Sequence, residues 1–262
     1  MSDVQTHAAR ESRPDLSSQV VLVTGAGRGL GRSGALYLAR CGAVVGVADI
    51  DGPGAQETAG LVRKAGGEAH AFEADLGSQA AFEQIAGELA QRCGRIDAVI
   101  NNAAWLKYEP LEAVTEETVD RMLAAGFKSA LWGAQALVRH MRPEVGGAIV
   151  NMSSPVAFRG YPGTVVYSAI KGAVTTLTKT LAAELGPRKV RVNAVAPASV
   201  PTPGGMGLND PAEYEKRARN IPLRRIGRES DNDRALAFLL SAEAEFITGI
   251  VLPVDGGVIA SN

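Results

Sequence analysis

Gln19-Val-Val-Leu-Val-Thr24 runs directly into Gly25-Ala-Gly-Arg-Gly-Leu-Gly31, and this junction sets the expectation for the whole chain. The first six residues are mostly apolar and β-branched, which predicts a buried strand. The glycines and the helical pattern of residues 32–41 predict a tight turn that leads into a helix N-terminus. Glycines let backbone approach a ligand closely, and the N–H groups of a helix N-terminus bind phosphate. The junction therefore predicts a dinucleotide site.

The next predicted strand, residues 43–48, ends at Asp49, roughly 20 residues beyond the glycine turn. A carboxylate there accepts hydrogen bonds from the adenosine ribose hydroxyls and repels a 2′-phosphate, which favours NAD over NADP. Arg28 argues for NADP, because a basic residue in the glycine run can pair with that phosphate. A turn residue before Gly52 is the other explanation of Asp49. We expect NAD, with NADP less favoured.

Strand-like segments alternate with helical ones along the rest of the chain. This alternation predicts a parallel sheet with helices on both faces, a doubly wound α/β fold in one domain. We assign residues 18–262 to that domain and residues 1–17 to a disordered leader. The remaining expected strands are 68–73, 96–100, 148–152, 190–195 and 250–252, and the expected helices are 54–65, 79–93, 116–142, 165–185 and 232–240.

Polar or small residues follow the third and fourth predicted strands, at the edge where open α/β sheets bind ligands. The polar ones are Asp75, beside Leu76, after the third strand and Asn101-Asn102 after the fourth. Asp75 can meet the adenine edge of a cofactor or cap the helix that follows, and both roles can hold. Residues 199–222 are Gly/Pro-rich and then helical and charged, which predicts a mobile lid over the substrate.

Composition narrows the class of protein. Lys and Arg number 27 against 28 Asp and Glu, so no basic surface for nucleic acid or an anionic membrane is expected. No apolar run suits a signal peptide or a membrane-spanning helix. Cys41 and Cys93 have no cysteine or histidine at ligand spacing, so we expect no disulfide and no metal site, and a cytoplasmic location fits. We assign no chemical role to His7, His70 or His140, and His70 is expected to be a strand residue.

Tyr167 and Lys171 stand four positions apart in a predicted helix, so their side chains lie one turn apart on one face. A phenol titrates near pH ~10, and an ammonium group beside it in a desolvated cleft favours the phenolate. Ser154, in an earlier loop, can donate its hydroxyl to an oxygen that carries developing charge. The three residues predict acid/base chemistry at a carbonyl or an alcohol. A Tyr-x-x-x-Lys pair alone is a weak signal, and its context gives it weight.

Six segments of the sequence form one combined pattern, and they are Thr24-Gly-Ala-Gly-Arg-Gly-Leu-Gly31, Asn101-Asn-Ala-Ala104, Ser154, Tyr167-x-x-x-Lys171, Arg191-Val-Asn-Ala-Val-Ala-Pro197 and Asp255-Gly-Gly257. Together they resemble the short-chain dehydrogenase/reductase family from about Ser18 to the C-terminus. The combination is highly specific, although no single segment is. The resemblance implies a Rossmann-type fold with a seven-stranded parallel sheet. It also implies an NAD(P)-dependent oxidoreductase that acts on an alcohol or carbonyl, usually as a homotetramer.

The resemblance also implies a role for each matching residue. Tyr167 would exchange a proton with the substrate oxygen, and Ser154 would hydrogen-bond that oxygen, whereas Ser153 is expected to be structural. Lys171 would hold the nicotinamide ribose and lower the pKa of Tyr167. The implied cofactor contacts are Gly25, Arg28, Gly29 and Leu30 at the pyrophosphate, Asp49 at the ribose, Asp75 and Leu76 at the adenine, Asn102 on the adenosine side, and Val200 and Thr202 at the carboxamide and pyrophosphate.

The sequence departs from the family pattern at several positions. The family usually has an asparagine in the long helix that positions a water for a proton relay, and alignment places Gly126 there. Glycine has no side chain for that task, so the relay is rerouted or weakened. Ala104, Pro155, Ile170 and Ala198 are lesser departures, and none removes the serine, tyrosine or lysine.

Three hypotheses about function remain. The first is an NAD-dependent oxidoreductase that moves a hydride between nicotinamide and a secondary alcohol or ketone. The second is a cofactor-binding sensor or partner subunit with weakened catalysis, which only Gly126 favours. The third is a lyase or epimerase with retained NAD.

Aromatic and apolar residues fall on loops expected to face the substrate. They suggest an apolar or ring-bearing alcohol, whereas a pocket lined by Arg217 or Arg219 would indicate an acidic substrate. Packing of the lid or of a subunit interface would explain some of them equally well. The residues are Trp105, Tyr108, Val156, Phe158, Tyr161 and Met206.

Overall fold

A seven-stranded parallel sheet forms the centre of the molecule in this computed structural model, which describes residues 13–202 and 211–261. The strand order is β3-β2-β1-β4-β5-β6-β7, and every neighbouring pair is parallel. The order reverses direction beside β1, as in a doubly wound sheet, which confirms the predicted fold class. The strands are β1 Val20–Thr24, β2 Val44–Asp49, β3 Ala69–Glu73, β4 Ala98–Asn101, β5 Gly147–Met152, β6 Val190–Pro197 and β7 Val251–Val254.

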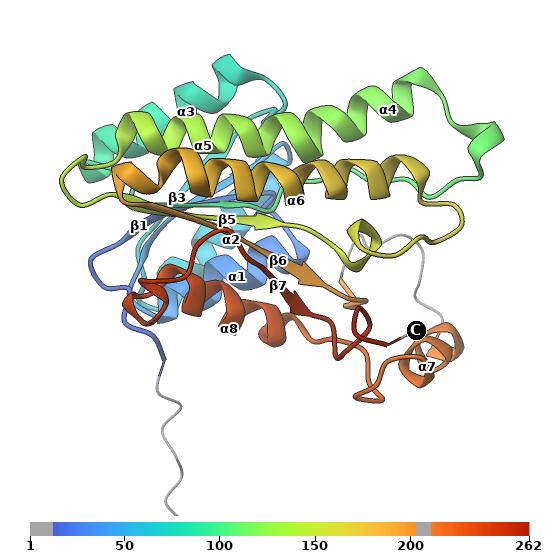
Figure 1. Ribbon diagram of the computed structural model, residues 1–262. Coiled ribbons are helices and arrows are strands. Elements are labelled where there is room, and N and C mark those ends of the chain that lie inside the picture. The colour runs from blue at the N-terminus through green and yellow to red at the C-terminus, as the bar shows by residue number, and fades with distance from the viewer. Residues whose placement is uncertain (1–12, 203–210, 262) are drawn as a thin grey trace, which may run out of the picture.

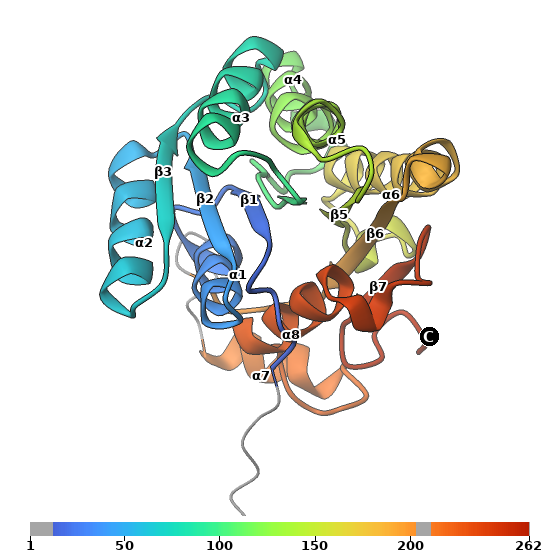
Figure 2. The same cartoon turned by 90° about the vertical axis from the view of Figure 1, so that its left-hand side faces the viewer.

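Helices cover both faces of the sheet (Figures 1 and 2). Helices α1, α2 and α8 supply side chains to the hydrophobic cluster on one face, and α3, α5 and α6 supply them on the other. The α-helices are α1 Gly29–Arg40, α2 Gly52–Lys64, α3 Gln79–Cys93, α4 Glu116–Met122, α5 Ser129–His140, α6 Val165–Leu185, α7 Pro211–Arg219 and α8 Glu229–Leu240. Short helical turns are η1 Leu111–Ala113, η2 Leu123–Lys128, η3 Pro155–Ala157, η4 Gly186–Arg188 and η5 Ala242–Ala244.

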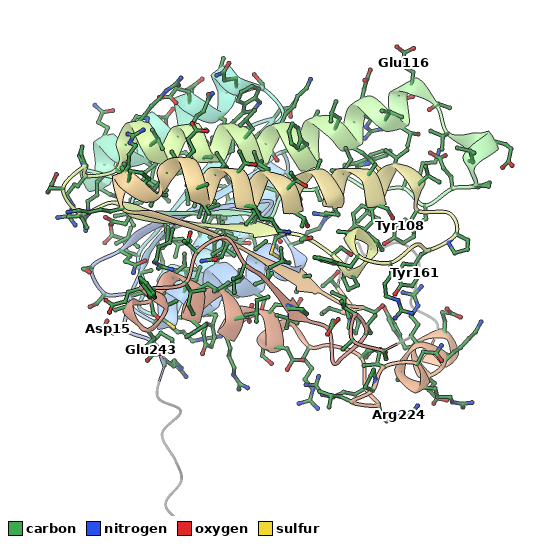
Figure 3. All side chains as sticks on the ribbon, viewed as in Figure 1. Asp15, Tyr108, Glu116, Tyr161, Arg224 and Glu243 are labelled. Carbon is green, nitrogen blue, oxygen red and sulfur yellow. The ribbon has the colours of Figure 1, made fainter. Side chains whose placement is uncertain are left out.

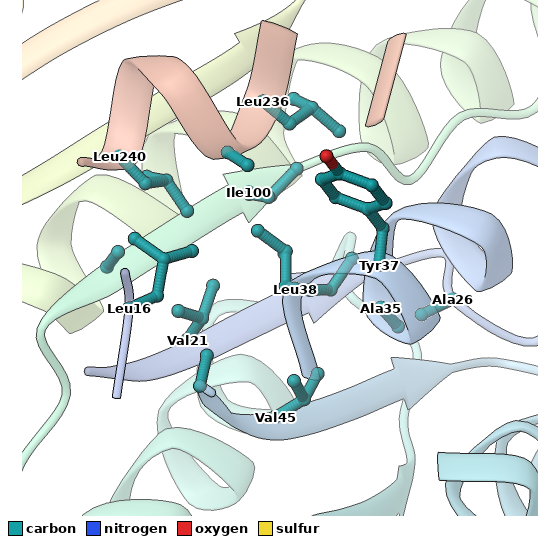
Figure 4. Packing of buried hydrophobic residues seen from close by; sticks show 14 of the residues in the cluster. Leu16, Val21, Ala26, Ala35, Tyr37, Leu38, Val45, Ile100, Leu236 and Leu240 are labelled. Carbon is teal, nitrogen blue, oxygen red and sulfur yellow. The ribbon is translucent and has the colours of Figure 1, made fainter. Parts of the chain in front are cut away.

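The central strands are buried on both faces, which explains their continuous apolar sequences. In Figure 4, Leu38 of α1 and Leu236 of α8 pack over Val21 of β1 and Ile100 of β4. Burying one such side chain contributes about 1.5–3 kcal/mol. This packing fixes α1 and α8 against the strands whose carboxyl ends carry the predicted site.

The predicted disordered leader, residues 1–17, is wrong for its last residues. Leu16 is 1% exposed and belongs to the core beside α1 and α8. Its N–H donates to the Cys41 carbonyl, and its carbonyl accepts from the N–H of Gln19. An apolar side chain at this point fills the space under the start of β1, so the chain is ordered there. Residues 1–12 lie outside the described residues.

The single helix predicted over 116–142 is interrupted. It divides into α4, the π-helical turn η2 and α5. The hydroxyl of Ser129 donates to the Ala125 carbonyl at 2.5 Å, and the buried Gly126 lies inside the widened turn. A π turn inserts one residue into a helix and occurs frequently at functional sites. Residue periodicity does not reveal it, because both flanks remain helical.

The predicted lid, 199–222, is described only in part. Helix α7 and the residues that follow it are in place, whereas residues 203–210, with Met206, lie outside the described residues. Across residues 13–202 and 211–261, no helix has both the length and the apolar character needed to cross a membrane.

Candidate active site

In the turn between β1 and α1, backbone segments pack so closely that only glycine fits at two positions. Gly25 has a φ of +62°, and a Cβ on it would lie 2.7 Å from the Cα of Ala103. A Cβ on Gly31 would lie 2.1 Å from the carbonyl oxygen of Gly25. Side chains at these two positions would push α1 away from the sheet. The first turn of α1 is therefore held where its free N–H groups can face an anion.

Side chains from two other strands hold this glycine turn. The Asn102 amide donates to the carbonyls of Thr24 and Gly25, both at 2.9 Å. The N–H of Gly27 donates to the Asp49 carboxylate at 2.8 Å. Asn102 follows β4 and Asp49 ends β2, and these strands are the two neighbours of β1. Both residues therefore hold the shape of the turn. This structural role is separate from the cofactor contacts that the family resemblance implies for them.

One cavity of about 690 Å³ collects most of the predicted site residues. It extends from Asp49 and Asp75 to Tyr167 and Lys171 along the carboxyl ends of the strands. Val200 and Ser154 are not among its lining residues, although Ser154 contacts Tyr167. The other predicted residues that line it are Gly25, Arg28, Gly29, Leu30, Leu76, Asn102 and Thr202.

The residues present fit a dinucleotide. The cavity has a glycine turn whose close packing leaves no room for a Cβ, the N-terminus of the twelve-residue helix α1, a carboxylate at one end and a buried amine at the other. Asp49 and Asp75 would meet the adenosine, the glycine turn the pyrophosphate, and Lys171 the far ribose. The volume lies within the usual range for cofactor sites.

The alternative role of Asp75 as a helix cap is wrong. Ser78 is the N-cap of α3, and its hydroxyl accepts from the N–H of Ala81. Asp75 instead accepts from the N–H of Gly77 at 3.0 Å and lines the cavity. The cap lies three residues later because the chain makes a turn before the helix begins.

Helix α6 presents Tyr167 and Lys171 from its first two turns, as the spacing predicts. The Lys171 ammonium is buried and donates to the Met152 carbonyl at 2.6 Å, and it lies 5.7 Å from the centre of the Tyr167 ring. Ser154, at the start of η3, hydrogen-bonds Tyr167. Ser153 is hydrogen-bonded to Thr175 at 2.7 Å, which fits its expected structural role.

Burial disfavours the charged forms of both ionisable groups. It raises the pKa of Tyr167; the nearby Tyr108 raises it further, and the Ser154 hydrogen bond lowers it. Burial also lowers the pKa of Lys171 to about 8. The expectation that Lys171 lowers the pKa of Tyr167 is therefore not met in this structure. The ammonium is turned to the Met152 carbonyl, and desolvation outweighs its attraction for a phenolate.

The substrate side is bounded by aromatic rings. Tyr108 packs against Tyr167 with ring centres 5.6 Å apart, at the end of the molecule where Figure 3 also labels Tyr161. Trp105 lines the cavity, and the guanidinium of Arg121 stacks on it 4.1 Å from the ring centre. Tyr108, Val156, Phe158 and Tyr161 are not among the lining residues.

An arginine that the sequence motifs did not single out, Arg121, lies near the aromatic residues. Arg121 lines the cavity, although its four-residue spacing from Glu117 resembles an ordinary surface pair. Arg217 of α7 donates to the Ser199 hydroxyl at 3.1 Å, and burial raises the pKa of Tyr108 while the charge of Arg217 partly offsets that rise. Arg219 is exposed and pairs with Glu215 at 3.8 Å. Neither Arg217 nor Arg219 lines the cavity itself.

Gly126 and Ile170, two separate departures from the family pattern, are in contact. A Cβ at position 126 would lie 2.8 Å from the Cγ2 methyl of Ile170. Ile170 is buried immediately before Lys171. Its methyl group therefore occupies the space into which a side chain at position 126 would extend.

The chain is similar to known oxidoreductases over nearly its whole length. A family model described as enoyl-(acyl carrier protein) reductase matches residues 25–259. 4-Formylbenzenesulfonate dehydrogenase of Comamonas testosteroni is 38% identical over 93% of this chain and 98% of its own. Cyclopentanol dehydrogenase of Comamonas sp. is 34% identical over 94% and 99%. The structure of a 7α-hydroxysteroid dehydrogenase complexed with NADH and 7-oxo glycochenodeoxycholic acid has a TM-score of 0.88 at 28% identity, covering 93% of this chain and 95% of that one.

Because of Lys171, the free energy of unfolding of the cofactor-free protein should change with pH in the alkaline range. Its pKa is about 8 when folded and 10.5 ordinarily, so the unfolded chain binds more protons between these values and stability rises with pH there. From pH ~8 to ~10 the free energy of unfolding should rise by about 2–3 kcal/mol relative to Lys171→Met. Urea unfolding across this range measures the difference. The exposed Lys179 gives the control Lys179→Met, and a wild type that parallels Lys171→Met would contradict the prediction.

Proposed function

The chain belongs to the short-chain dehydrogenase/reductase family, and from this premise we propose that it is an NAD-dependent oxidoreductase that interconverts a secondary alcohol and its ketone. Members of this family are oxidoreductases that use a nicotinamide cofactor on alcohols or ketones. The observation that carries the proposal is the single cavity joining Asp49 to Tyr167 and Lys171. Cofactor binding at one end and proton transfer at the other then share one enclosed space.

Asp49 supports NAD as the cofactor. Its two carboxylate oxygens accept from the N–H groups of Gly27 and Asp51, and each oxygen keeps a lone pair that can accept from a ribose hydroxyl. The fixed negative charge repels a 2′-phosphate. Arg28 lines the same cavity and supports NADP as the less favoured alternative.

Proton transfer falls to Tyr167. A bound nicotinamide cofactor would supply or accept the hydride at the substrate carbon. Tyr167, which is protonated at neutral pH as an ordinary phenol is and whose pKa burial raises further, would donate to a carbonyl oxygen, and Ser154 would hold that oxygen in place. In the direction of oxidation the phenol must first lose its proton. Lys171 would favour that loss only with its ammonium turned from the Met152 carbonyl toward the phenol, and its lowered pKa of about 8 keeps it charged below that pH.

A ring-bearing substrate fits the aromatic wall. Trp105 offers a flat apolar ring in the lining of the cavity, and Tyr108, outside that lining, packs against Tyr167. The relatives named for cyclopentanol and 4-formylbenzenesulfonate, and the steroid dehydrogenase, take ring compounds. Arg217 lies outside the cavity lining, near Tyr108, and pairs with Glu213 at 3.4 Å. A ring compound that extends past Tyr108 could bring a carboxylate or sulfonate to this guanidinium, which binds such groups through paired hydrogen bonds.

Other functions have less support. A sensor or partner subunit would need no acid/base group, and Ser154, Tyr167 and Lys171 are brought together. A lyase or epimerase with retained NAD would turn over substrate without a net change in NADH. We further propose that the protein works as a homotetramer, as the family resemblance implies, and that it is cytoplasmic, which its two free cysteines favour.

Replacing Tyr167 by phenylalanine separates an enzyme from a sensor. We expect Tyr167→Phe to lower kcat by about 10²–10⁴-fold while the affinity for NADH changes little, because only the proton-transfer group is lost. NAD-linked oxidation of cyclic secondary alcohols and NADH fluorescence measure the two quantities. Tyr161→Phe, outside the cavity, is the control. Unchanged turnover in Tyr167→Phe would refute the proposed role of this tyrosine.

Cofactor choice can be measured without a substrate. The wild type should bind NADH more tightly than NADPH, and Asp49→Ser should reduce that preference by about tenfold, equivalent to 1.4 kcal/mol. Fluorescence titration with each cofactor gives both affinities. Asp51→Ser is the matched control, because Asp51 caps α2 and serine is also a good cap. Tighter binding of NADPH by the wild type would show that Arg28 prevails over Asp49.

The acidic class of substrate is tested by paired compounds. For ring-bearing alcohols that differ only in a carboxylate, Arg217→Gln should lower kcat/KM about tenfold for the charged member and leave the neutral one nearly unchanged. Arg219→Gln, on the same helix but exposed and paired with Glu215, is the control. An equal loss for both compounds would indicate a structural role for Arg217.

A further inference from the structure

Three metal-ligating side chains meet at the amino end of the edge strand β3. The ligand atoms of Glu68, His70 and Cys93 all lie within 4.8 Å of one another. The Nε2 atom of His70 is 3.3 Å from a carboxylate oxygen of Glu68. In sequence Cys93 is 23 residues beyond His70, so its spacing predicts no site, and only the fold unites the three.

Regular structure fixes the backbone of all three residues. Glu68 is held to β2, because its carbonyl accepts from the N–H of Val45, and His70 pairs with Gly46 in the sheet. Residues 68 and 70 project from the same face of the strand because strand side chains alternate. Cys93 is the last residue of α3, and it packs against the cluster on that face. With these backbones fixed, rotation of the side chains is the movement that would bring all three ligand atoms to one metal ion.

The donor set and its spacing suit zinc. Bonds of about 2.0–2.3 Å in a tetrahedral site place the ligand atoms about 3.3–3.8 Å apart. His70 and Glu68 already have this separation, and Cys93 needs a shift of about 1 Å. A thiolate, an imidazole and a carboxylate leave the fourth position to solvent.

The charged groups around the three residues are compatible with a bound cation. The nearby guanidinium groups are engaged with their own carboxylates: Arg92 with Glu88 at 3.5 Å and Arg95 with Asp97 at 2.9 Å. A Glu68 carboxylate and a Cys93 thiolate repel each other, and a divalent ion between them replaces that repulsion with attraction.

We propose that Glu68, His70 and Cys93 form a zinc site that ties the edge strand β3 to the end of α3. Zinc binding converts the Cys93 thiol to a thiolate, and the proton passes to solvent. The site lies at the amino end of β3, whereas the cavity begins beyond its carboxyl end at Ala74 and Asp75. It therefore stabilises the sheet edge and does not depend on the proposed oxidoreductase activity.

Cobalt absorption provides the direct test. Titrating the full-length, untagged protein with Co²⁺ should give one equivalent of binding, the intense visible bands of tetrahedral cobalt and a thiolate charge-transfer band in the near ultraviolet. Zn²⁺ should bleach these bands by displacement, and it should raise the thermal unfolding midpoint by several degrees. A spectrum without the charge-transfer band would overturn the assignment of Cys93.

Variants identify the ligands. Cys93→Ser should abolish the charge-transfer band, and His70→Gln and Glu68→Gln should each weaken binding by about tenfold or more. Glu68 is exposed, so Glu68→Gln keeps the fold and guards against misfolding of the other variants. Cys41→Ser and His140→Gln are controls that should bind as the wild type does. Unchanged cobalt binding in all three ligand variants would refute the site.

Discussion

The site depends on the bracing of one backbone turn by its neighbours in the sheet. The glycine turn after β1 is held in part by side chains that lie outside it. Asn102 and Asp49, from the strands on either side, provide the hydrogen bonds that hold it. Parallel register brings the three strand ends level, so these bonds form only once β2, β1 and β4 are paired. Assembly of the sheet and formation of the cofactor site are therefore one event.

The chemistry at the other end of the cavity depends on desolvation. Tyr167 and Lys171 are both held in surroundings that oppose their charges, so small changes in contact or solvent access alter which form dominates. The Lys171 ammonium donates one of its hydrogen bonds to the Met152 carbonyl, which fixes the position of its side chain. The strand that delivers Ser154 to the site thus also positions the lysine, through its last carbonyl.

Local patterns in the sequence predicted the glycine turn, the strand alternation and the Tyr167–Lys171 pair, because each is encoded by neighbouring residues. Such local patterns do not predict contacts between segments that are distant in the sequence. The stacking of Arg121 on Trp105 and the meeting of His70 with Cys93 arise only when separate elements pack. Leu16 was missed because one apolar residue in a polar segment carries no periodicity. The π turn was missed because helical periodicity continues on both sides of it.

The contact between Gly126 and Ile170 makes these two positions interdependent. With isoleucine at position 170, a Cβ at position 126 would lie 2.8 Å from its Cγ2 methyl group, so a side chain fits at 126 only if that methyl group shifts or residue 170 also changes. The effects of substitutions at 126 and 170 therefore should not add, and an amide placed at position 126 calls for a smaller residue at position 170.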